Sequence, residues 1–340
     1  MTGELGVVIL GAGRVSTAHA RATAETQGAR LIGVADVDKG RADAFAATWR
    51  CEAFTDYADA LKRDDVHIVT IALPHHLHER ATVDACSAGK HVFIEKPMAD
   101  TVEECDRMIA AAEKAKVRLF VAHTQRYFAS TIKARQILES GDVGTPIFAT
   151  DTWYKPFGIE TRPPWMLDRA TGGGMWLMDG AHQIDRTCWV LDGDVESVKA
   201  HIGNEFHGTK ADDSELAFLR LRNGRHAVIV HTGYAKRGVN KCEVEVACTN
   251  GMVRFDSYSN WVQIDQDHKY VPVDVEKVDP FAAEMRNFVA AIQGREKMGV
   301  TPQWGRHVVE VLVACEESSR TGREVKIQSR GLEVPVGSAR

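Results

Sequence analysis

The chain has 340 residues, of which 44% are hydrophobic and 26% charged, and its formal net charge is −5. This length is enough for two domains with sizeable cores, and the composition is typical of globular proteins. The slight negative charge, without a long basic run, argues against nucleic acid as a partner. No apolar run approaches the ~20 residues that span a bilayer, which argues against a membrane protein.

Seven cysteines are scattered along the chain, without a CxxC pair. A disulfide framework or a zinc site needs characteristic spacings, so we expect reduced thiols in a cytoplasmic protein. A strand pattern begins within a few residues of Met1, which leaves no room for a signal peptide. Residues 331–340 are expected to form a mobile tail.

The first 36 residues carry a strand–turn–helix–strand pattern. An apolar run over 5–10 leads into a glycine-rich turn, a helical stretch over 17–27 and a second apolar run over 31–35, which ends in an acid. This succession is the dinucleotide-binding fingerprint in the context that it requires. We therefore predict a nucleotide-binding domain of the Rossmann type.

Three positions of this turn carry the nucleotide chemistry. Gly11 allows the tight turn, and Gly13 lets the backbone approach a pyrophosphate. The following helix directs its first N–H groups and a partial positive charge at the phosphates. The third glycine position is occupied by Ser16, which is also small.

Asp36, at the end of the second strand, predicts which dinucleotide binds. A carboxylate there accepts hydrogen bonds from the ribose 2′-OH and repels a 2′-phosphate. We therefore expect NAD as the cofactor. The nearby Lys39 and Arg41 leave NADP possible.

Further helical and strand patterns lead to an apolar run over 66–72, and the loop that follows contains His75, His76 and His78. Their spacing does not place all three on a common face, and no cysteine or acid cluster lies close in the sequence. We therefore expect these histidines to lie near the nucleotide rather than to bind a metal. A helix over 78–88 follows and ends at a glycine.

Glu95-Lys96-Pro97 directly follows a short apolar strand over 91–94. In an open α/β sheet this carboxyl edge is where ligands bind. Pro97 stops strand pairing and restricts the residue before it, so Lys96 is held ready for chemistry. A helix over 102–115, with a capping box at its start, and a strand over 117–122 complete a doubly wound parallel sheet over residues 1–124.

The pattern changes after residue 124. Most of the remaining strand patterns alternate with period two, and Asn223-Gly and Asn250-Gly are hairpin turns. We predict an α+β domain over 125–330, built on a large open sheet that is mainly antiparallel. The expected strands cover 147–154, 198–202, 214–221, 226–231, 241–248, 252–255, 261–265 and 270–273, and the expected helices cover 130–140, 175–190, 280–293 and 301–320.

The helix expected over 175–190 follows three glycines and contains Asp179, His182 and Asp185. Residues three apart share a helix face, so the imidazole is flanked by a carboxylate on either side. A carboxylate bonded to one ring nitrogen orients the ring and raises its basicity. The glycines allow the backbone to approach a substrate closely.

The chain resembles the glucose–fructose oxidoreductase / inositol dehydrogenase / rhizopine-catabolism (Gfo/Idh/MocA) family. The matching segments are Gly11–Ser16, Ala72–Pro74 with His78, Ala88–Pro97, Gln125–Tyr127, and Gly172–Gly174 with His182–Asp185. The resemblance implies a Rossmann domain joined to an α/β domain whose open sheet mediates dimer or tetramer assembly. It also implies NAD(P)-dependent oxidation of a secondary alcohol.

By position, Lys96 matches the lysine that bridges substrate and nicotinamide ribose, and His182 matches the catalytic proton acceptor. The family usually has an aspartate four residues before this histidine, where the present chain has Met178. Asp179 lies three residues before it, turned by roughly 100° around an α-helix, and is the candidate replacement.

The predicted reaction is hydride transfer between a secondary alcohol of a sugar, cyclitol or related polyol and nicotinamide. The alternatives are a cis-dihydrodiol dehydrogenase of aromatic catabolism and a non-catalytic NAD-dependent sensor. The predicted catalytic residues are Lys96, His182 and Asp179. The predicted cofactor-binding residues are Gly11, Gly13, Arg14, Val15, Asp36, Leu73, Pro74, His75, His78, Glu95, Lys96 and Gln125. The predicted substrate-binding residues are Lys96, Arg126, Tyr127, Trp153, Tyr154, Arg162, Trp165, Trp176, Asp179 and His182.

Overall fold

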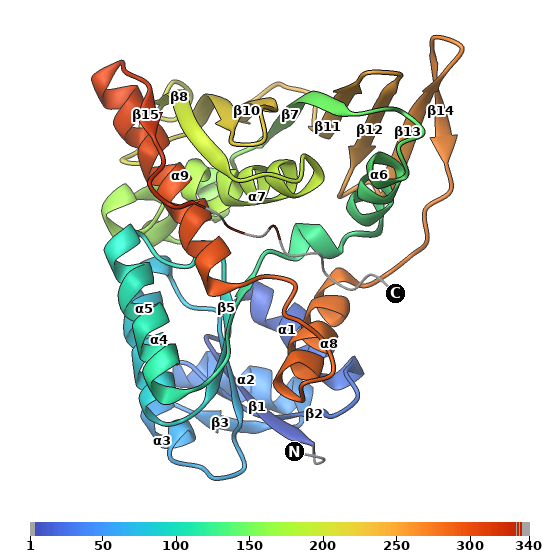
Figure 1. Ribbon diagram of the computed structural model, residues 1–340. Coiled ribbons are helices and arrows are strands. Elements are labelled where there is room, and N and C mark those ends of the chain that lie inside the picture. The colour runs from blue at the N-terminus through green and yellow to red at the C-terminus, as the bar shows by residue number, and fades with distance from the viewer. Residues whose placement is uncertain (1–3, 331, 333, 335–340) are drawn as a thin grey trace. The chain divides into compact units, whose positions relative to one another are not determined.

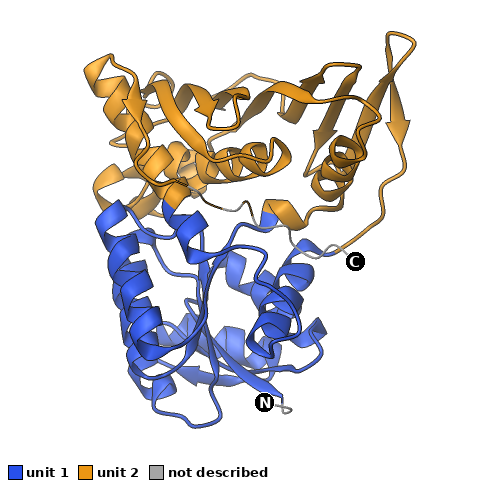
Figure 2. Cartoon of the chain, in the orientation of Figure 1, with its two compact units in different colours: residues 1–124, 279–306, 335–340 blue, residues 125–278, 307–334 orange. Residues whose placement is uncertain are grey.

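The computed structural model describes residues 4–330, 332 and 334 and divides into two compact units (Figure 2). The first unit comprises the described residues up to 124 together with 279–306, and the second comprises 125–278 and the described residues from 307 onward. Of the tail expected over 331–340, residues 331, 333 and 335–340 lie outside the described residues.

The first unit is built on a parallel sheet of six strands in the order β3-β2-β1-β4-β5-β6 (Figure 1). This is the strand order of the Rossmann fold, and it confirms the predicted sheet. The inner strands are buried along their length because helices cover both faces, so their sequences are continuous apolar runs. The strands are β1 Leu5–Leu10, β2 Ala29–Ala35, β3 Glu52–Phe54, β4 Ile68–Ile71, β5 His91–Glu95 and β6 Leu119–Ala122.

The helices of this unit begin close to the expected positions. In α5 the capping box between Thr101 and Glu104 is present, so that prediction is confirmed. The helix after the glycine-rich turn begins at Arg14, directly after Gly13 and three residues earlier than expected. The helices are α1 Arg14–Glu25, α2 Lys39–Trp49, α3 Tyr57–Leu61, α4 His78–Ser87 and α5 Val102–Ala115, with a short 3-10 turn at His75–Leu77. A further 3-10 turn, Thr124–Tyr127, begins at the last residue of this unit and continues in the second.

Helix α8, Pro280–Ile292, belongs to the first unit, although the sequence pattern placed it in the domain over 125–330. Its Phe288 ring lies 5.6 Å from that of Phe93 on β5 and 5.4 Å from that of Phe120 on β6. Phe281 lies 5.5 Å from His19 of α1. The helix packs here because these aromatic contacts bury its apolar face against the parallel sheet.

The second unit is built on a sheet of nine strands in the order β14-β13-β12-β11-β7-β10-β9-β8-β15. Every neighbouring pair is antiparallel except β7 and β10, which confirms the predicted open, mainly antiparallel sheet. The strands are β7 Pro146–Pro156, β8 Val195–Gly203, β9 Ser214–Leu221, β10 His226–Tyr234, β11 Lys241–Cys248, β12 Met252–Asp256, β13 Trp261–Gln266, β14 Lys269–Val273 and β15 Val325–Lys326.

The two faces of this sheet differ. Helices α6, Ala129–Ser140, and α7, Ala181–Val190, pack against one of them, which we call the inner face (Figure 1). The opposite, outer face exposes Phe148, Leu216 and Phe218 by 47%, 50% and 42%. Helix α9, Pro302–Thr321, begins in the first unit and continues in the second. Short 3-10 turns at Ile159–Thr161, Pro164–Leu167 and Arg169–Thr171 lie between β7 and α7.

The segment before α7 differs from the single helix expected over 175–190. Residues Trp176–Gly180 form a π-helical turn, which is wider than an α-helical one. Trp176 is fully buried, and its backbone and indole N–H groups donate to Asp212 and to the carbonyl of Leu312. Gly180 leaves room for the Trp176 ring, because an added Cβ would lie 2.6 Å from that ring. The wider turn therefore accommodates this anchored tryptophan.

Candidate active site

The glycine-rich turn has the geometry that a dinucleotide needs. Gly11 has φ +96°, and a Cβ there would lie 2.5 Å from the carbonyl oxygen of Ala72. A Cβ on Gly13 would meet nothing within 4 Å. Among the described residues, no side chain caps the N-terminus of α1, so its first N–H groups can bind phosphate. Arg14 and Val15, also predicted cofactor residues, form the first turn of α1.

Asp36 is positioned at the carboxyl end of β2, and its carboxylate is only 8% exposed. It accepts hydrogen bonds from the backbone N–H groups of Ala12 and Asp38, both at 2.9 Å. The guanidinium of Arg41 binds the same carboxylate at 3.0 Å. The sequence left open a contact of Arg41 with a 2′-phosphate. In the structure Arg41 is paired with Asp36, and this arrangement fits NAD.

Lys96 is held through its backbone by its neighbour Glu95. The Glu95 carboxylate accepts from the Lys96 N–H at 3.2 Å and lies 2.8 Å from Nε2 of the buried His19. Burial alone would raise the pKa of Glu95, but the hydrogen bond and charge of His19, together with the charge of Lys96, lower it overall. The carboxylate therefore stays ionised and fixes the backbone at the end of β5.

His78 connects the loop after β4 with the segment after Lys96. Its two ring nitrogens lie 3.0 Å from the carbonyl oxygens of Pro97 and Leu73. Burial lowers the pKa of His78, and the neighbouring His75 ring lies 5.5 Å away. The predicted cofactor residues from Leu73 to His78 are thus brought to the end of the sheet where Lys96 lies. Among the described residues, no three His, Cys, Asp or Glu side chains are arranged to hold a metal ion.

In the second unit, a buried network surrounds Asp151 on β7. Its carboxylate accepts from Arg186 at 2.6 Å, from Gln183 at 2.8 Å and from Thr187 at 2.9 Å, all on α7. Arg186 also donates to the amide oxygen of Gln125 at 2.6 Å. The predicted cofactor residue Gln125 is therefore part of the network that fixes α7 to the sheet.

Arg126 and Asp185 form a second buried pair. Nε of Arg126 lies 2.8 and 3.0 Å from the two carboxylate oxygens of Asp185, and both side chains are almost fully buried. The sequence had placed Asp185 beside His182 and Arg126 on the substrate wall. The structure instead brings these two residues together, and their contact with a substrate stays a prediction.

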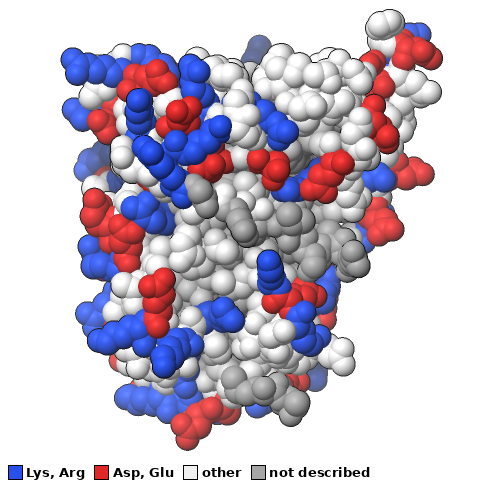
Figure 3. Space-filling model, viewed as in Figure 1, with Lys and Arg blue, Asp and Glu red and all other residues white. Residues whose placement is uncertain are grey.

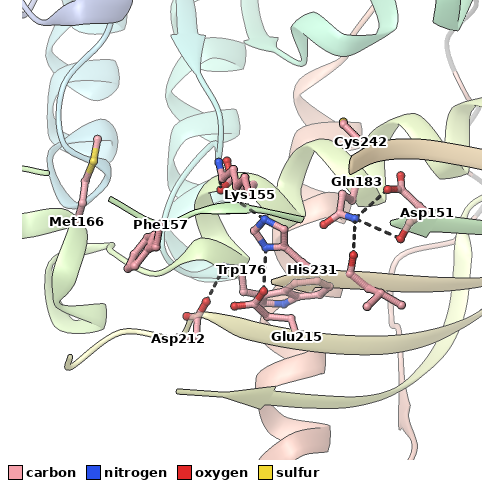
Figure 4. Close-up of polar contacts among 12 residues, drawn as sticks. Asp151, Lys155, Phe157, Met166, Trp176, Gln183, Asp212, Glu215, His231 and Cys242 are labelled. Atoms are coloured by element: carbon pink, nitrogen blue, oxygen red, sulfur yellow. Dashed lines mark hydrogen bonds and ion pairs between the residues drawn. The ribbon is translucent and has the colours of Figure 1, made fainter. Parts of the chain in front are cut away.

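Asp179 lies in the π-helical turn and is engaged by two residues of the sheet. Nζ of Lys155 is 2.5 Å from its Oδ2, and Nε2 of His231 is 3.6 Å from the same atom. Nδ1 of His231 lies 2.8 Å from Glu215 (Figure 4). The sequence reasoning missed Lys155, His231 and Glu215. The sequence contained one signal for Lys155. Side chains two residues apart in a strand point to the same face, so Lys155 shares a face with Asp151 and Trp153.

The aromatic residues predicted to line the substrate site are dispersed. The Trp153 ring lies on the inner face, 6.2 Å from that of His182. Tyr154 is the next residue of β7, so its side chain points to the opposite face. Trp176 is fully buried, and Arg162 lies over the ring of Phe157 at 4.5 Å. The two remaining wall residues are Tyr127, which is 8% exposed, and Trp165, which is half-buried in a 3-10 turn.

Two family models match this chain. The oxidoreductase family model with an NAD-binding Rossmann fold covers residues 5–123, and the GFO/IDH/MocA C-terminal domain model covers residues 131–254. The chain belongs to the Gfo/Idh/MocA oxidoreductase family. As a member of this family it is an NAD-dependent dehydrogenase, which confirms the predicted enzyme class and cofactor and argues against the sensor alternative. Within the described residues, no helix combines the length and apolar character that crossing a membrane requires.

Other Gfo/Idh/MocA proteins are similar over all or part of the chain. Inositol 2-dehydrogenase of Salmonella typhimurium is 25% identical over 95% of this chain and 96% of its own length. A 1-carboxy-3-chloro-3,4-dihydroxycyclohexa-1,5-diene dehydrogenase of Comamonas testosteroni is 30% identical, over 61% of this chain and 52% of its own. The crystal structure of an aldose-aldose oxidoreductase from Caulobacter crescentus, complexed with glycerol, has a TM-score of 0.86 and 25% identity, and the match covers 95% of this chain and 99% of that one.

Proposed function

We propose that this enzyme oxidises a secondary alcohol of a sugar, cyclitol or related polyol, with NAD as the hydride acceptor. The observation that carries the proposal is the anchoring of Lys96. Its backbone is held by Glu95 at the carboxyl end of β5, the edge of a parallel sheet at which ligands bind. The names of relatives that act on inositol and aldoses support the substrate class.

Lys96 and His182 are proposed to act on the same substrate oxygen. His182 removes the hydroxyl proton, a role suited to an imidazole, which titrates near neutrality. The ammonium of Lys96 donates to that oxygen and stabilises the negative charge that develops on it. When bound, NAD supplies the hydride acceptor. Asp179 is proposed as the acid that replaces the one missing at Met178.

A cis-dihydrodiol of aromatic catabolism is the second candidate substrate. Two observations favour it: the similarity to the dihydroxycyclohexadiene dehydrogenase, and the Trp153 ring on the inner face near His182. An aromatic ring stacks on a cyclohexadiene as readily as on the apolar face of a sugar. Both candidate classes are cyclic or linear alcohols with several hydroxyl groups.

A substrate screen tests the proposed function. Sugars, cyclitols, other polyols and cis-dihydrodiols are incubated with the enzyme and NAD, and NADH absorbance is followed. We expect turnover of one of these classes and loss of that turnover in His182→Ala. If no secondary alcohol is oxidised, while an alcohol of another class or an aldehyde is, the proposed substrate class is wrong.

The cofactor preference is expected to depend on Asp36. Titration should show tighter binding of NAD than of NADP, because the carboxylate repels a 2′-phosphate. Asp36→Ala should narrow this difference by removing the repulsion and freeing Arg41 from its ion pair. Asp59→Ala, which removes an exposed carboxylate from α3, is the matched control and should leave the preference unchanged. A wild-type enzyme that prefers NADP would contradict the assignment.

The outer face of the large sheet is proposed to mediate a homodimer or homotetramer. Phe148 on β7 and Leu216 and Phe218 on β9 are exposed there on the two strands that flank β10, and exposed apolar patches mark interaction sites. Figure 3 shows acidic and basic side chains interspersed on the displayed face of each unit, without a large surface of one sign. The cytoplasmic location expected from the cysteine pattern stays a prediction.

Light scattering at micromolar concentration should therefore give at least twice the chain mass of 37.5 kDa. Phe218→Arg should shift the enzyme toward the monomer, since burying one such side chain contributes about 1.5–3 kcal/mol. Val239→Arg changes an exposed apolar residue in the loop after β10 and serves as the control. A wild-type particle of 37.5 kDa would refute the proposal.

A further inference from the structure

The inner face of the large sheet carries polar groups at positions where packing against a helix favours apolar side chains. Lys155 lies on β7, His231 on β10 and Glu215 on β9. His231 is the cross-strand neighbour of both Trp153 and Glu215 in the sheet register. Figure 4 shows the imidazole between the side chains of Lys155 and Glu215. Buried ionisable groups are costly unless they are paired, so their arrangement is informative.

Lys155 and His231 converge on Asp179, and Glu215 lies behind His231. Its Oδ2 is 2.5 Å from Nζ of Lys155 and 3.6 Å from Nε2 of His231. The Lys155 side chain is 23% exposed and that of Asp179 is 9% exposed, whereas His231 and Glu215 are closed off from solvent. The lysine–carboxylate pair is therefore the accessible end of the cluster, and the imidazole and Glu215 form its buried support.

The charges of the cluster follow from its burial. Burial lowers the pKa of His231 to about 3, so the imidazole is neutral at physiological pH. Burial, followed by the negative charge of Asp212, raises the pKa of Glu215 well above its usual value. Lys155 is then the cation of this cluster that faces Asp179. The accessible end is a lysine–carboxylate pair with no net charge.

This pair lies in the neighbourhood of the proposed proton acceptor. The Lys155 ammonium sits over the Trp153 ring at 4.5 Å from its centroid, and the His182 ring lies 6.2 Å from the same centroid. All three residues belong to the second unit. Lys155 and His182 thus both neighbour the Trp153 ring, and Asp179 precedes His182 by three residues, so the pair is placed to contact another hydroxyl of a polyol that binds at His182.

We propose that Lys155 and Asp179 form a clamp for a second hydroxyl, next to the one that is oxidised, and that the substrates are consequently vicinal diols. A hydroxyl is both donor and acceptor, so one group accepts from the ammonium and donates to the carboxylate. This inference rests on the proposed function and narrows it, because cyclitols and cis-dihydrodiols share this pair of hydroxyls. Because the pair has no net charge, it is not expected to bind an anionic substituent better than a hydroxyl.

His231 is assigned a positioning role within the clamp. Its Nδ1 lies 2.8 Å from Glu215, and its Nε2 lies 3.6 Å from Oδ2 of Asp179. The buried imidazole thus lies between Glu215 and Asp179, and its role is to hold Asp179 in place beside Lys155.

The test compares two alcohols that differ by one hydroxyl, cis-1,2-cyclohexanediol and cyclohexanol, with NAD as the cofactor. The wild-type enzyme should oxidise the diol with a kcat/KM about 10- to 100-fold higher, the range expected for hydrogen bonds to charged groups. Lys155→Met should lose most of this preference, and its turnover of cyclohexanol should change much less. Asp179→Asn should also lose the preference, but its turnover of cyclohexanol should fall as well, because Asp179 is a proposed catalytic residue. Lys269→Met, on the exposed end of β14, is the matched control and should retain the preference.

Further variants separate binding from folding. Lys155→Arg keeps a cation beside Asp179 and should retain part of the preference, and thermal unfolding of each variant identifies a loss that comes from instability. His231→Gln should raise KM for the diol with little change in kcat, because His231 acts on Asp179 and not on the reacting carbon. A change in kcat alone, at unaltered KM, would contradict the positioning role.

The outcomes distinguish the clamp from the function on which it rests. Equal kcat/KM for the two alcohols in the wild-type enzyme overturns the clamp and leaves the proposed dehydrogenase function intact. The same holds if Lys155→Met, correctly folded, keeps the full preference for the diol. If the enzyme oxidises neither these alcohols nor any polyol of the screen, the proposed function is overturned, and the clamp with it.

Discussion

Lys96→Met and His182→Ala are each expected to lower kcat by about 10²–10⁴-fold, the usual contribution of a general acid–base group. NAD affinity should change little, because the Lys96 backbone is fixed by Glu95 and the proposed dinucleotide contacts include the turn before α1, which the substitutions leave intact. Steady-state kinetics with the substrate from the screen, together with NAD titration, measure both quantities. Lys90→Met, at the other end of β5, is the control for losing one lysine near that strand.

The double variant tests whether the two residues act together. Groups that act on the same oxygen are not additive, so Lys96→Met/His182→Ala should lose less than the product of the two single losses. A loss equal to that product would indicate independent roles. If His182→Ala retains nearly normal turnover, another residue carries the proton, and the proposed mechanism is wrong.

Arg186→Met is expected to destabilise the second unit by about 3–5 kcal/mol, because it leaves the carboxylate of Asp151 buried without its cation. Both side chains of this pair are fully buried, and Arg186 also holds Gln125. Burial alone would lower the pKa of Arg186, but the charge of Asp151 raises it overall, so the guanidinium is charged in the folded enzyme. Denaturant unfolding, followed by tryptophan fluorescence, measures the loss.

Lys241→Met provides the comparison for this substitution. It also removes one positive charge from the large sheet, but Lys241 is 42% exposed and its carboxylate partner, Glu243, is 4.0 Å away. Exposed pairs of this kind contribute about 0–1 kcal/mol. If the two variants unfold at the same denaturant concentration, the Asp151 network does not stabilise the unit in the way described.

The first unit was largely predictable because its signals are local. Buried parallel strands are continuous apolar runs, and the glycine-rich turn and the Glu95-Lys96-Pro97 segment follow strands directly. Two features escaped this reasoning. Strand β3 has only three residues, none of them fully buried, and therefore no apolar run. Helix α8 joins the first unit through aromatic contacts with residues more than 150 positions earlier in the chain, and no local pattern reports these contacts.

The second unit shows where local patterns stop. Alternation of apolar and polar residues predicted strands such as β9 and β11 with their observed bounds. This alternation does not specify which strands pair with each other. The parallel pairing of β7 with β10 joins segments far apart in sequence. The cluster around Asp179 depends on that pairing, so Lys155 and His231 could not be assigned from the sequence. The π-helical turn that holds Asp179 was likewise hidden, because its residue Trp176 is anchored by a contact with Asp212, 36 positions later in the chain.

Trp153, His231 and Glu215 form a single row across three adjacent strands, fixed by the hydrogen-bonded ladder. Strand geometry makes such a row intolerant of insertions and deletions. One residue added to β10 ahead of His231 would turn its imidazole to the outer face and bring an apolar neighbour under Asp179. The same addition at the Asn223-Gly224 turn would only lengthen a surface loop. Natural length variation in this region is therefore expected to concentrate in the hairpin turn and to spare the strands themselves.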